Sequence, residues 1–303
     1  MSITGQNLSI VIVTLKSENV IFECLDSIDP KIPVFIIENS NNFEFKKLIE
    51  KKYNNVKCSL TNKNLGMGSG NNFGIRLVKT EYVLILNPDV ILEPNTLEEL
   101  EVSSKKCQNF AILSPISANT KYPNYKLYPG DDFNKQNDSL FKVRSVDGYA
   151  MLFNKKIINK ILEKESNNKD LNYFDENFFM YLENDDLCKR IIKNNGKIFI
   201  SSKAKINHLG GKAVNEVYKD EVELSRNWHW IWSKFYFNKK HYGLLKALKY
   251  GLPNFLLSTL KTVFFFITLN KTKKKIYFNR AAGFFNALIG KRSWYRPKFD
   301  QLD

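Results

Sequence analysis

Several familiar signatures are missing from this chain of 303 residues, and each absence narrows its class. Residues 1–6 carry no basic stretch, and the apolar run at residues 8–15 is too short and too β-branched for a signal peptide. The four cysteines form no CxxC pair, so we expect thiols in a reducing compartment, not disulfides or a zinc site. Neither GxGxxG nor GxxxxGK[ST] occurs, which excludes the two commonest phosphate-loop fingerprints.

Negative charge is missing from the last quarter of the chain. Residues 226–299 contain 16 Lys or Arg and no Asp or Glu, which leaves 30 of the 46 basic residues beside all 31 acidic ones. The net charge of +15 therefore belongs almost wholly to this quarter. We predict a boundary near residue 225, with one domain at residues 1–225 and a basic helical tail at residues 226–303.

Strands and helices alternate through the first part of the chain. Apolar, β-branched runs predict buried strands, and stretches with helical spacing separate them. The predicted strands are residues 8–15, 34–39, 56–61 and 82–86. Short links between alternating elements predict an α/β fold with a mostly parallel central sheet and helices on both faces.

The sequence YVLILNPDV at residues 82–90 ends the fourth of these strands. Pro88 cannot continue a central strand, so Asp89 follows directly at the carboxyl end of the sheet, where ligands bind in open α/β folds. A single carboxylate there suits a hard cation that carries phosphate oxygens. The alternative is an ordinary turn whose Asp caps the helix expected after Pro94.

Residues 64–74 contain three glycines at intervals of two before a helix that opens on Asn71 and Asn72. Free backbone amides at a helix start suit an anion, and amide side chains can hydrogen-bond a base or ribose. A simple cluster of helix caps remains the alternative.

A group of acids at residues 183–186, ENDD, follows the apolar stretch FFMYL. Acids are favoured at helix N-termini, and Asp186 can pair with Arg190 one turn later, so a structural role is open. The functional interpretation is a general base, since an aromatic wall should raise the pKa of a neighbouring carboxylate.

His208 is one of only three histidines and lies in a polar loop after a predicted strand. An apolar stripe would indicate a core histidine, whereas this position leaves the ring available. Imidazole is an acceptable ligand for a Mn-like ion and a poorer one for Mg²⁺.

The tail is apolar, aromatic and basic between residues 241 and 275. Its longest apolar run, residues 252–269, is interrupted by Pro253 and Lys261, which disfavours a spanning helix. We predict a helix that lies on an anionic membrane surface. A helical cap with solvated cations and a nucleic-acid surface built on Trp228 and its neighbours are the alternatives, and we expect no nucleic-acid partner.

These motifs together resemble family-2 glycosyltransferases, and most closely the rhamnosyltransferase-like branch. The resemblance covers residues 8–211 and excludes the tail. It rests on seven segments in order: LSIVIVTL, FIIENS, NLGMGSGNNFGI, YVLILNPDV, VDGYAML, FFMYLENDDLCKR and INHLGG.

The resemblance implies a nucleotide-sugar-binding GT-A domain and assigns roles to individual residues. Nucleotide contacts are expected from Thr14, Glu38, Asn64, Gly66, Asn72 and Asn87. Most members have Asp where this chain has Glu38, and Asn87 stands where other branches have a second acid. A divalent ion, Mg²⁺ or Mn²⁺, is expected on Asp89 and His208.

The remaining expected roles concern the acceptor and the proton. Asp147 and Gly148 match the segment that lines the sugar and acceptor. The family's usual Glu-Asp pair is Glu183-Asn184 here, and because Asn cannot take a proton, Glu183 is the expected base with Asp185 in reserve.

The implied activity is inverting, metal-dependent transfer of rhamnose or another hexose from a dTDP- or UDP-sugar. The acceptor would be a glycan or a lipid-linked saccharide in cell-surface polysaccharide synthesis, at the inner face of the cytoplasmic membrane. An inactive relative that binds nucleotide-sugar or lipid is the alternative.

Overall fold

The computed structural model describes residues 7–132, 139–165 and 172–299. They form two compact units. An α/β unit contains the residues up to 175 together with residues 184–215, and a helical unit contains residues 176–183 together with those from 216 onward. The change in charge composition near residue 225 falls inside the first long helix of the helical unit.

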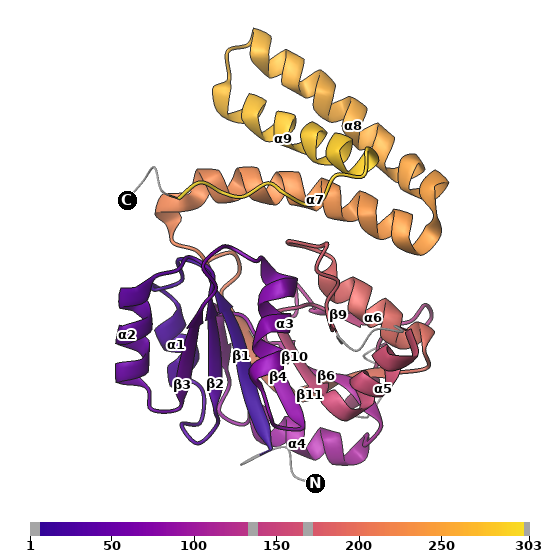
Figure 1. The fold of residues 1–303 in the computed structure, drawn as a ribbon. Coiled ribbons are helices and arrows are strands. Elements are labelled where there is room, and N and C mark those ends of the chain that lie inside the picture. The colour runs from indigo at the N-terminus through magenta and orange to yellow at the C-terminus, as the bar shows by residue number, and fades with distance from the viewer. Residues whose placement is uncertain (1–6, 133–138, 166–171, 300–303) are drawn as a thin grey trace. The chain divides into compact units, whose positions relative to one another are not determined.

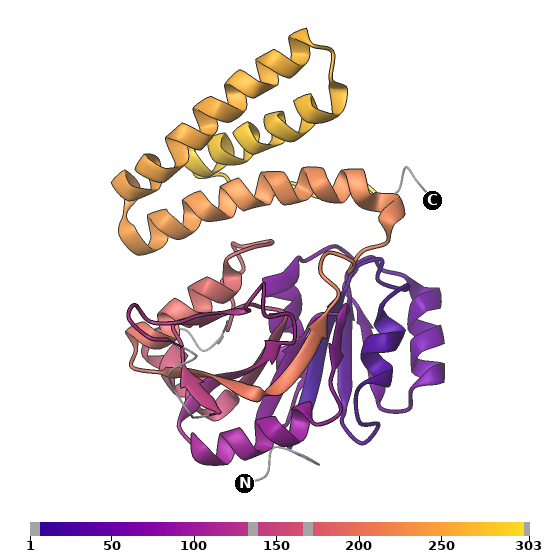
Figure 2. The ribbon, with the colours of Figure 1, turned by 180° about the vertical axis from the view of Figure 1, so that it is seen from behind.

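The α/β unit is built on a mixed sheet of nine strands, and Figures 1 and 2 show its two sides. The strand order is β3-β2-β1-β4-β10-β6-β11-β5, with β8 also paired to β11. Their bounds are β1 (Leu8–Thr14), β2 (Val34–Glu38), β3 (Val56–Leu60), β4 (Tyr82–Leu86), β5 (Val90–Leu92), β6 (Phe110–Ser117), β8 (Leu140–Lys142), β10 (Ala150–Asn154) and β11 (Lys197–His208). A separate pair, β7 (Tyr125–Lys126) and β9 (Ser145–Val146), lies antiparallel.

The four strands expected from sequence are confirmed, and they run parallel as β3-β2-β1-β4. The sheet turns mixed at β10, which is antiparallel to both β4 and β6. The polar region at residues 119–132 contains the short strand β7.

Helices cover both faces of this sheet, as the alternating pattern predicts. Alternate residues of β1 point to opposite sides, so Ile10 and Ile12 join one core while Val11 and Val13 join the other. Helices of the first core are α1 (Ile21–Asp26), α2 (Phe43–Lys52) and α4 (Thr96–Lys106), and those of the second are α3 (Met67–Leu77), α5 (Lys155–Glu165) and α6 (Glu183–Lys193). The four cysteines are free and buried.

Three long helices form the helical unit: α7 (Lys219–Tyr242), α8 (Leu244–Ile267) and α9 (Lys271–Leu288), after the short 3-10 helix η2 (Glu216–Tyr218). Aromatic residues fill its core, including Trp228, Phe235 and Phe284. The packing is close, because a Cβ on Gly283 would lie 2.3 Å from the carbonyl oxygen of Trp228. Only glycine allows α9 to approach the α7 backbone there.

Candidate active site

The first two strands of the sheet end on buried polar residues that face each other in register. Thr14 closes β1, Glu38 closes β2, and the two are Cα partners, each 1% exposed. Among the described residues, no hydrogen-bond partner reaches Thr14 Oγ1. A buried hydroxyl without a partner at the carboxyl end of parallel strands is suited to a ligand.

The Glu38 carboxylate accepts a hydrogen bond from the backbone N–H of Ser40 at 2.7 Å and another from the Ser40 hydroxyl. Burial raises the pKa of Glu38, and these two hydrogen bonds offset part of that rise. An acid in this setting can accept hydrogen bonds from hydroxyl or N–H groups of a ligand.

The glycine-rich segment differs from its expected form. The expected turn through three glycines is wrong, because α3 begins at Met67 and already contains Gly68 and Gly70. A Cβ on Gly70 would lie 3.0 Å from Val13, and one on Gly74 would lie 2.3 Å from Val11. These glycines let α3 pack closely on β1, so tertiary packing overrides their usual role as helix breakers.

The helix start at Gly66 still offers polar groups. Gly66 has φ 81° and donates its N–H to Asn64 Oδ1 at 3.0 Å. Within the described residues, Asn64 Nδ2 and Asn71 Oδ1 are buried without a hydrogen-bond partner. The first-turn amides of α3 and these two side chains could hold an anion or a base.

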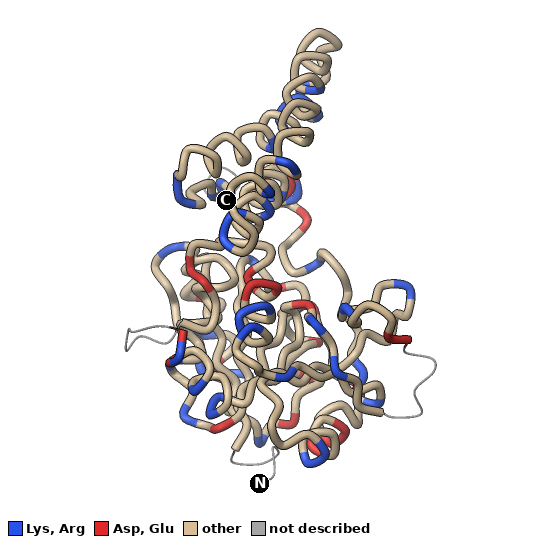
Figure 3. The backbone as a smooth tube through the Cα atoms, turned by 90° about the vertical axis from the view of Figure 1, so that its right-hand side faces the viewer, with Lys and Arg blue, Asp and Glu red and all other residues tan. Residues whose placement is uncertain are grey.

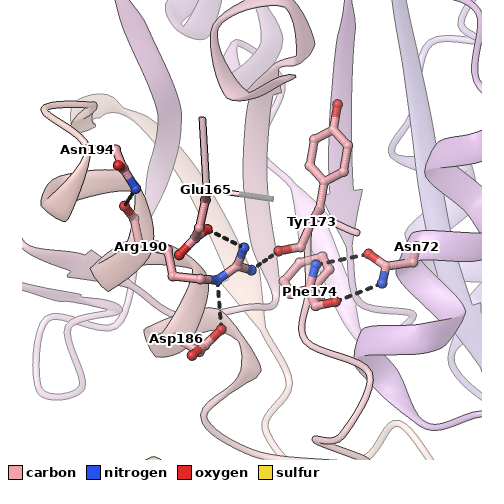
Figure 4. Close-up of polar contacts among 7 residues, drawn as sticks. All are labelled: Asn72, Glu165, Tyr173, Phe174, Asp186, Arg190 and Asn194. Atoms are coloured by element: carbon pink, nitrogen blue, oxygen red, sulfur yellow. Dashed lines mark hydrogen bonds and ion pairs between the residues drawn. The ribbon is translucent and has the colours of Figure 1, made fainter. Parts of the chain in front are cut away.

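Asn72, expected to contact the nucleotide, is engaged by the chain itself. Its side chain donates to the carbonyl oxygen of Phe174 at 2.8 Å and accepts from the Phe174 N–H at 2.9 Å. Figure 4 shows this two-bond contact. Asn72 lies in the second turn of α3 and is 2% exposed, and its amide fixes the segment around Phe174. Its expected contact with the nucleotide stays a prediction.

Asp89 and His208 lie together, brought there by the pairing of two strands. His208 is the last residue of β11 and pairs with Val90, so the expected polar loop is wrong: the strand continues through to the histidine. Asp89 Oδ2 lies 3.5 Å from His208 Nε2, and Oδ1 has no hydrogen-bond partner within the described residues. The His208 ring stacks on Tyr149, with 4.0 Å between ring centroids.

This pair fits two ligands of a divalent ion. The Asp89 carboxylate is 2% exposed and has one oxygen without a partner, which is an orphaned acceptor that a cation would satisfy. No group of three or more His, Cys, Asp or Glu suited to a metal occurs in the described ranges. A site of this kind would take its other ligands from water and substrate phosphates, as magnesium sites commonly do.

Asp147 and Asp185 lie in the same neighbourhood. Burial raises the pKa of Asp147. The charges of Lys126 and His208 oppose this rise, and the charge of Asp185 adds to it. Asp185 pairs with Lys126 Nζ at 2.9 Å. Gly148 packs closely on α6, since a Cβ there would lie 3.3 Å from the side chain of Asn184.

The start of α6 is held by its own residues. Asn184 Nδ2 donates to the carbonyl oxygen of Val146 at 2.9 Å. Asp186 is fully buried and pairs with Arg190 at 2.9 Å, as the spacing predicts. Arg190 also contacts Glu165 at 3.2 Å and the backbone oxygen of Tyr173 (Figure 4). These groups are structural, which leaves Glu183 and Asp185 as the candidate bases.

Glu183 is the first residue of α6 and also ends the segment 176–183, which packs within the helical unit. Burial raises the pKa of Tyr181 to about 12, and the negative charge of Glu183 contributes to this rise. The aromatic residues before Glu183 pack on α7: Phe178 contacts Tyr236. Their expected effect on the pKa of Glu183 stays a prediction.

Three residues of the site were not foreseen. Tyr149 follows the Asp147-Gly148 pair directly, so its presence near His208 could have been inferred from that segment. Lys126 lies in a region that has the composition of a loop, and no sequence signal indicated its ion pair. Asn71 was noticed only as part of a helix start.

Comparison with known proteins identifies the family. Residues 9–162, just over half of the chain, match the profile of "Glycosyl transferase family 2". The chain belongs to this family. The expected family and GT-A fold are confirmed.

One curated relative of this family-2 chain is the "Low-salt glycan biosynthesis hexosyltransferase Agl10" of Haloferax volcanii. It is 26% identical over 207 residues, which cover 62% of this chain. The chain spans 62% of that relative's length.

Two solved structures share the fold. The crystal structure of GalNAc-T7 with UDP, GalNAc and Mn2+ has a TM-score of 0.54 at 13% identity, covering 74% of this chain and 51% of that one. The crystal structure of S. aureus TarS 1-349 has a TM-score of 0.52 at 15% identity, covering 96% of this chain and 93% of that one. Identities this low support the fold alone.

Proposed function

We propose that this chain is an inverting, metal-dependent glycosyltransferase. It moves rhamnose or another hexose from a nucleotide-diphosphate donor to a saccharide or lipid-linked acceptor in cell-surface polysaccharide synthesis. The observation that carries the proposal is Asp89, a buried carboxylate with an oxygen left without a partner among the described residues, at the end of β4 and beside His208. Family membership supports the reaction class.

The nucleotide is proposed to bind along the carboxyl ends of β1, β2 and β4. Thr14 and Glu38 would accept or donate hydrogen bonds to ribose and base, with Asn64 and the Gly66 backbone beside the diphosphate. Asn87, which is partly exposed, would contact the donor from the end of β4. A donor such as dTDP- or UDP-sugar suits this set, because all of these groups recognise hydroxyl, amide or phosphate oxygens.

Asp89 and His208 would hold Mg²⁺ or Mn²⁺. The ion would supply positive charge beside the diphosphate, which offsets the negative charge that develops as the nucleotide departs. Neighbouring groups hold the two residues in place: the Leu209 N–H donates to the Asp89 backbone oxygen at 3.0 Å, and Tyr149 stacks on the His208 ring. The likeness to a structure solved with UDP and Mn2+ makes the same choice of group reasonable.

Glu183 is the proposed base, with Asp185 in reserve. A single carboxylate that removes the acceptor hydroxyl's proton, acting opposite the departing diphosphate, gives direct displacement and inversion at the anomeric carbon. Asp185 is already paired with Lys126, so it is the weaker candidate. Asp147 and Gly148 would line the sugar and acceptor.

A thermal-shift screen tests the donor and the ion together. The full chain is heated with dTDP-, UDP- and GDP-sugars, each with and without Mn²⁺ or Mg²⁺. A true donor at a hundred times its Kd should stabilise the chain by about 2.7 kcal/mol, and only with the ion present. Asp89→Asn should remove the ion-dependent part, whereas Glu99→Gln, an equal change of charge on α4, should keep it. An unchanged shift in Asp89→Asn would overturn the metal assignment.

The helical unit is proposed to attach the enzyme to the inner face of the cytoplasmic membrane. α8 is long and apolar enough to cross a membrane by length and composition, and 6% of that window is buried. Its large apolar side chains are more than half exposed at Leu256, Leu257, Leu260, Val263, Phe264 and Ile267. Lys249, Pro253 and Lys261 interrupt the apolar sequence of this helix, which favours a position in the membrane interface over a span.

Charge complementarity selects an anionic surface. α8 and α9 contain eight Lys or Arg and no acid, and Figure 3 shows their blue segments without red ones. Each cation near an anionic leaflet contributes about 1 kcal/mol. A lipid-linked acceptor would be presented at the same surface.

Vesicle sedimentation tests this attachment. The full chain should bind vesicles that contain phosphatidylglycerol, bind neutral vesicles much less, and be released as salt increases. Replacing Leu260 and Ile267 on α8 with Ser should weaken binding, whereas Leu48→Ser on α2, also exposed, should not. Equal binding by both variants would overturn the assignment, and binding to oligonucleotides instead would favour the nucleic-acid alternative.

A second candidate is a catalytically inactive relative that binds nucleotide-sugar or lipid. Asn184 favours it, because it stands where the family pair has an acid and its amide is used to hold the Val146 carbonyl. Donor binding without any transfer or hydrolysis in the wild-type chain would support this candidate.

A further inference from the structure

The segment that leads into the proposed base is packed within the helical unit. Residues 176–183 cluster with the helices, while the chain from Asn184 onward clusters with the sheet. Phe179, 3% exposed, lies between two side chains of this unit. The His229 ring lies 4.5 Å from it between centroids, and the Arg296 guanidinium carbon lies 3.6 Å from its centroid.

The two groups that hold Phe179 are themselves fixed. His229 Nε2 donates to the Tyr295 carbonyl oxygen at 2.8 Å, and Nδ1 accepts from the Ser293 hydroxyl at 3.0 Å. Burial lowers the pKa of His229 to about 3, so the ring is neutral and rigidly oriented at neutral pH. Arg296 donates to the backbone oxygens of Ser293 and Tyr295. The ring of Phe179 thus enters a rigid, partly cationic clamp.

The backbone next to Phe179 is held as well. The Ser233 hydroxyl on α7 donates to the Met180 carbonyl oxygen at 2.7 Å. The Tyr181 ring meets Trp230 edge to face, with 5.4 Å between centroids. Both α7 residues lie on the helix that also carries His229.

Two residues with a left-handed backbone separate this clamp from Glu183. Tyr181 has φ 70° and Leu182 has φ 66°, a conformation that side chains other than glycine rarely adopt. Such residues are strained and persist only where surrounding contacts impose them. Those contacts come from His229 and Arg296 on Phe179, from Ser233 on Met180 and from Trp230 on Tyr181.

The preceding stretch is fixed from the α/β unit. Asn72 binds both backbone groups of Phe174, and Arg190 binds the Tyr173 carbonyl oxygen. These hydrogen bonds fix residues 173 and 174, just before the segment 176–183 begins.

We infer that the clamp formed by Ser233, His229 and Arg296 positions Glu183 for proton removal. This inference rests on the proposed function. The helical unit thus contributes to catalysis by orienting a carboxylate, in addition to any role in membrane attachment. These residues act through Glu183 and touch no reacting atom.

Steady-state kinetics of the full chain with a soluble acceptor test the inference. Phe179→Ala empties the clamp, and we expect kcat to fall between tenfold and a hundredfold, as a misplacement of about 1 Å can cause. The KM and thermal shift for the donor should change less than twofold. The pH dependence of kcat should also move, because Glu183 would leave its environment. Phe179→Leu, which keeps apolar volume, should recover part of kcat.

Matched variants separate positioning from loss of stability. Phe255→Ala removes a ring stacked on Phe284 in the same unit and should lower the melting temperature without the drop in kcat. Ser233→Ala loses one hydrogen bond and is compared with Ser258→Ala, a buried serine of α8. If Phe179→Ala fails to fold, Ser233→Ala alone should lower kcat at unchanged donor affinity.

The outcomes distinguish this inference from the proposed function. Wild-type chain that turns over no donor would reject the proposed function. Active wild type, with kcat in Phe179→Ala and Ser233→Ala equal to that of their controls, would reject the clamp alone. A parallel loss of kcat and donor affinity would also reject it, because it would indicate general unfolding.

Discussion

The two units of this chain differ in charge and in how completely they cover their apolar surface. The sheet of the α/β unit is buried on both faces, and the buried polar residues Thr14, Glu38 and Asp89 lie where its strands end. The helical unit has a dense aromatic core but leaves most of α8 exposed, and its residues 226–299 contain 16 Lys or Arg and no Asp or Glu. The first pattern supports the proposed ligand site, and the second supports the proposed membrane surface. The segment 176–183, which ends on the proposed base Glu183, clusters with the helices.

The sharpest test of the division is the identity of the base. Glu183→Gln should lower kcat by about 10²- to 10⁴-fold, the usual contribution of a general base, with donor affinity retained. Asp185→Asn, in the α/β unit, should have a smaller effect because its carboxylate already pairs with Lys126. Initial-rate assays with both variants decide the question. A larger loss of kcat in Asp185→Asn than in Glu183→Gln would assign the base to Asp185, a residue of the α/β unit.

Acid should separate the units by stability. Burial lowers the pKa of His229 from 6.5 to about 3, so the unfolded chain binds the proton more tightly than the folded one. Stability from this group is full above pH 6.5 and is lost as pH falls toward 3, by on the order of a few kcal/mol. All four tryptophans, Trp228, Trp230, Trp232 and Trp294, lie in the helical unit, so their fluorescence reports it selectively.

The matched variant for this experiment is His229→Gln, whose side chain does not titrate. Denaturant midpoints followed by tryptophan fluorescence at pH 7 and pH 5 should differ less in the variant than in the wild type. Equal pH dependence in both would show that carboxylates elsewhere control the acid response.

Glycine packing compares the rigidity of the two cores. Gly283→Ala would place a Cβ 2.3 Å from a backbone carbonyl oxygen of α7, and Gly74→Ala would place one 2.3 Å from a Val11 side chain. Overpacking typically costs about 1–3 kcal/mol, and we expect Gly283→Ala near the upper end because backbone cannot rotate away. Tryptophan fluorescence should report the loss in Gly283→Ala, whereas far-UV circular dichroism should report the loss in Gly74→Ala.

The strands were predictable because each is a continuous apolar run with β-branched residues, as in the confirmed strand Tyr82–Leu86. The position of Asp89 followed from Pro88, whose missing N–H ends a central strand. Local composition was sufficient for both.

Contacts between distant segments were not predictable in the same way. Gly68 and Gly70 look like a turn, and their place inside α3 depends on the distance to β1 that only the fold sets. His208 reads as a loop residue, but pairing of β11 with β5 extends the strand to it. The ion pair of Lys126 with Asp185 joins residues that no periodicity relates.

The smallest expected effect concerns the ligand edge itself. Burial raises the pKa of Glu38 above its usual 4.5, so the folded chain holds that proton more tightly than the unfolded chain. Stability from this group is full below pH 4.5 and declines as pH rises through the raised folded value. Glu38→Gln removes the buried charge and keeps an acceptor for Ser40, and it should raise the melting temperature slightly at pH 7. The gain should shrink toward pH 4.5, and donor affinity should fall. A variant that is less stable at pH 7 would mean that the ionised carboxylate, with its Ser40 hydrogen bonds, stabilises the fold. Glu38 would then have a structural role in addition to any contact with a ligand.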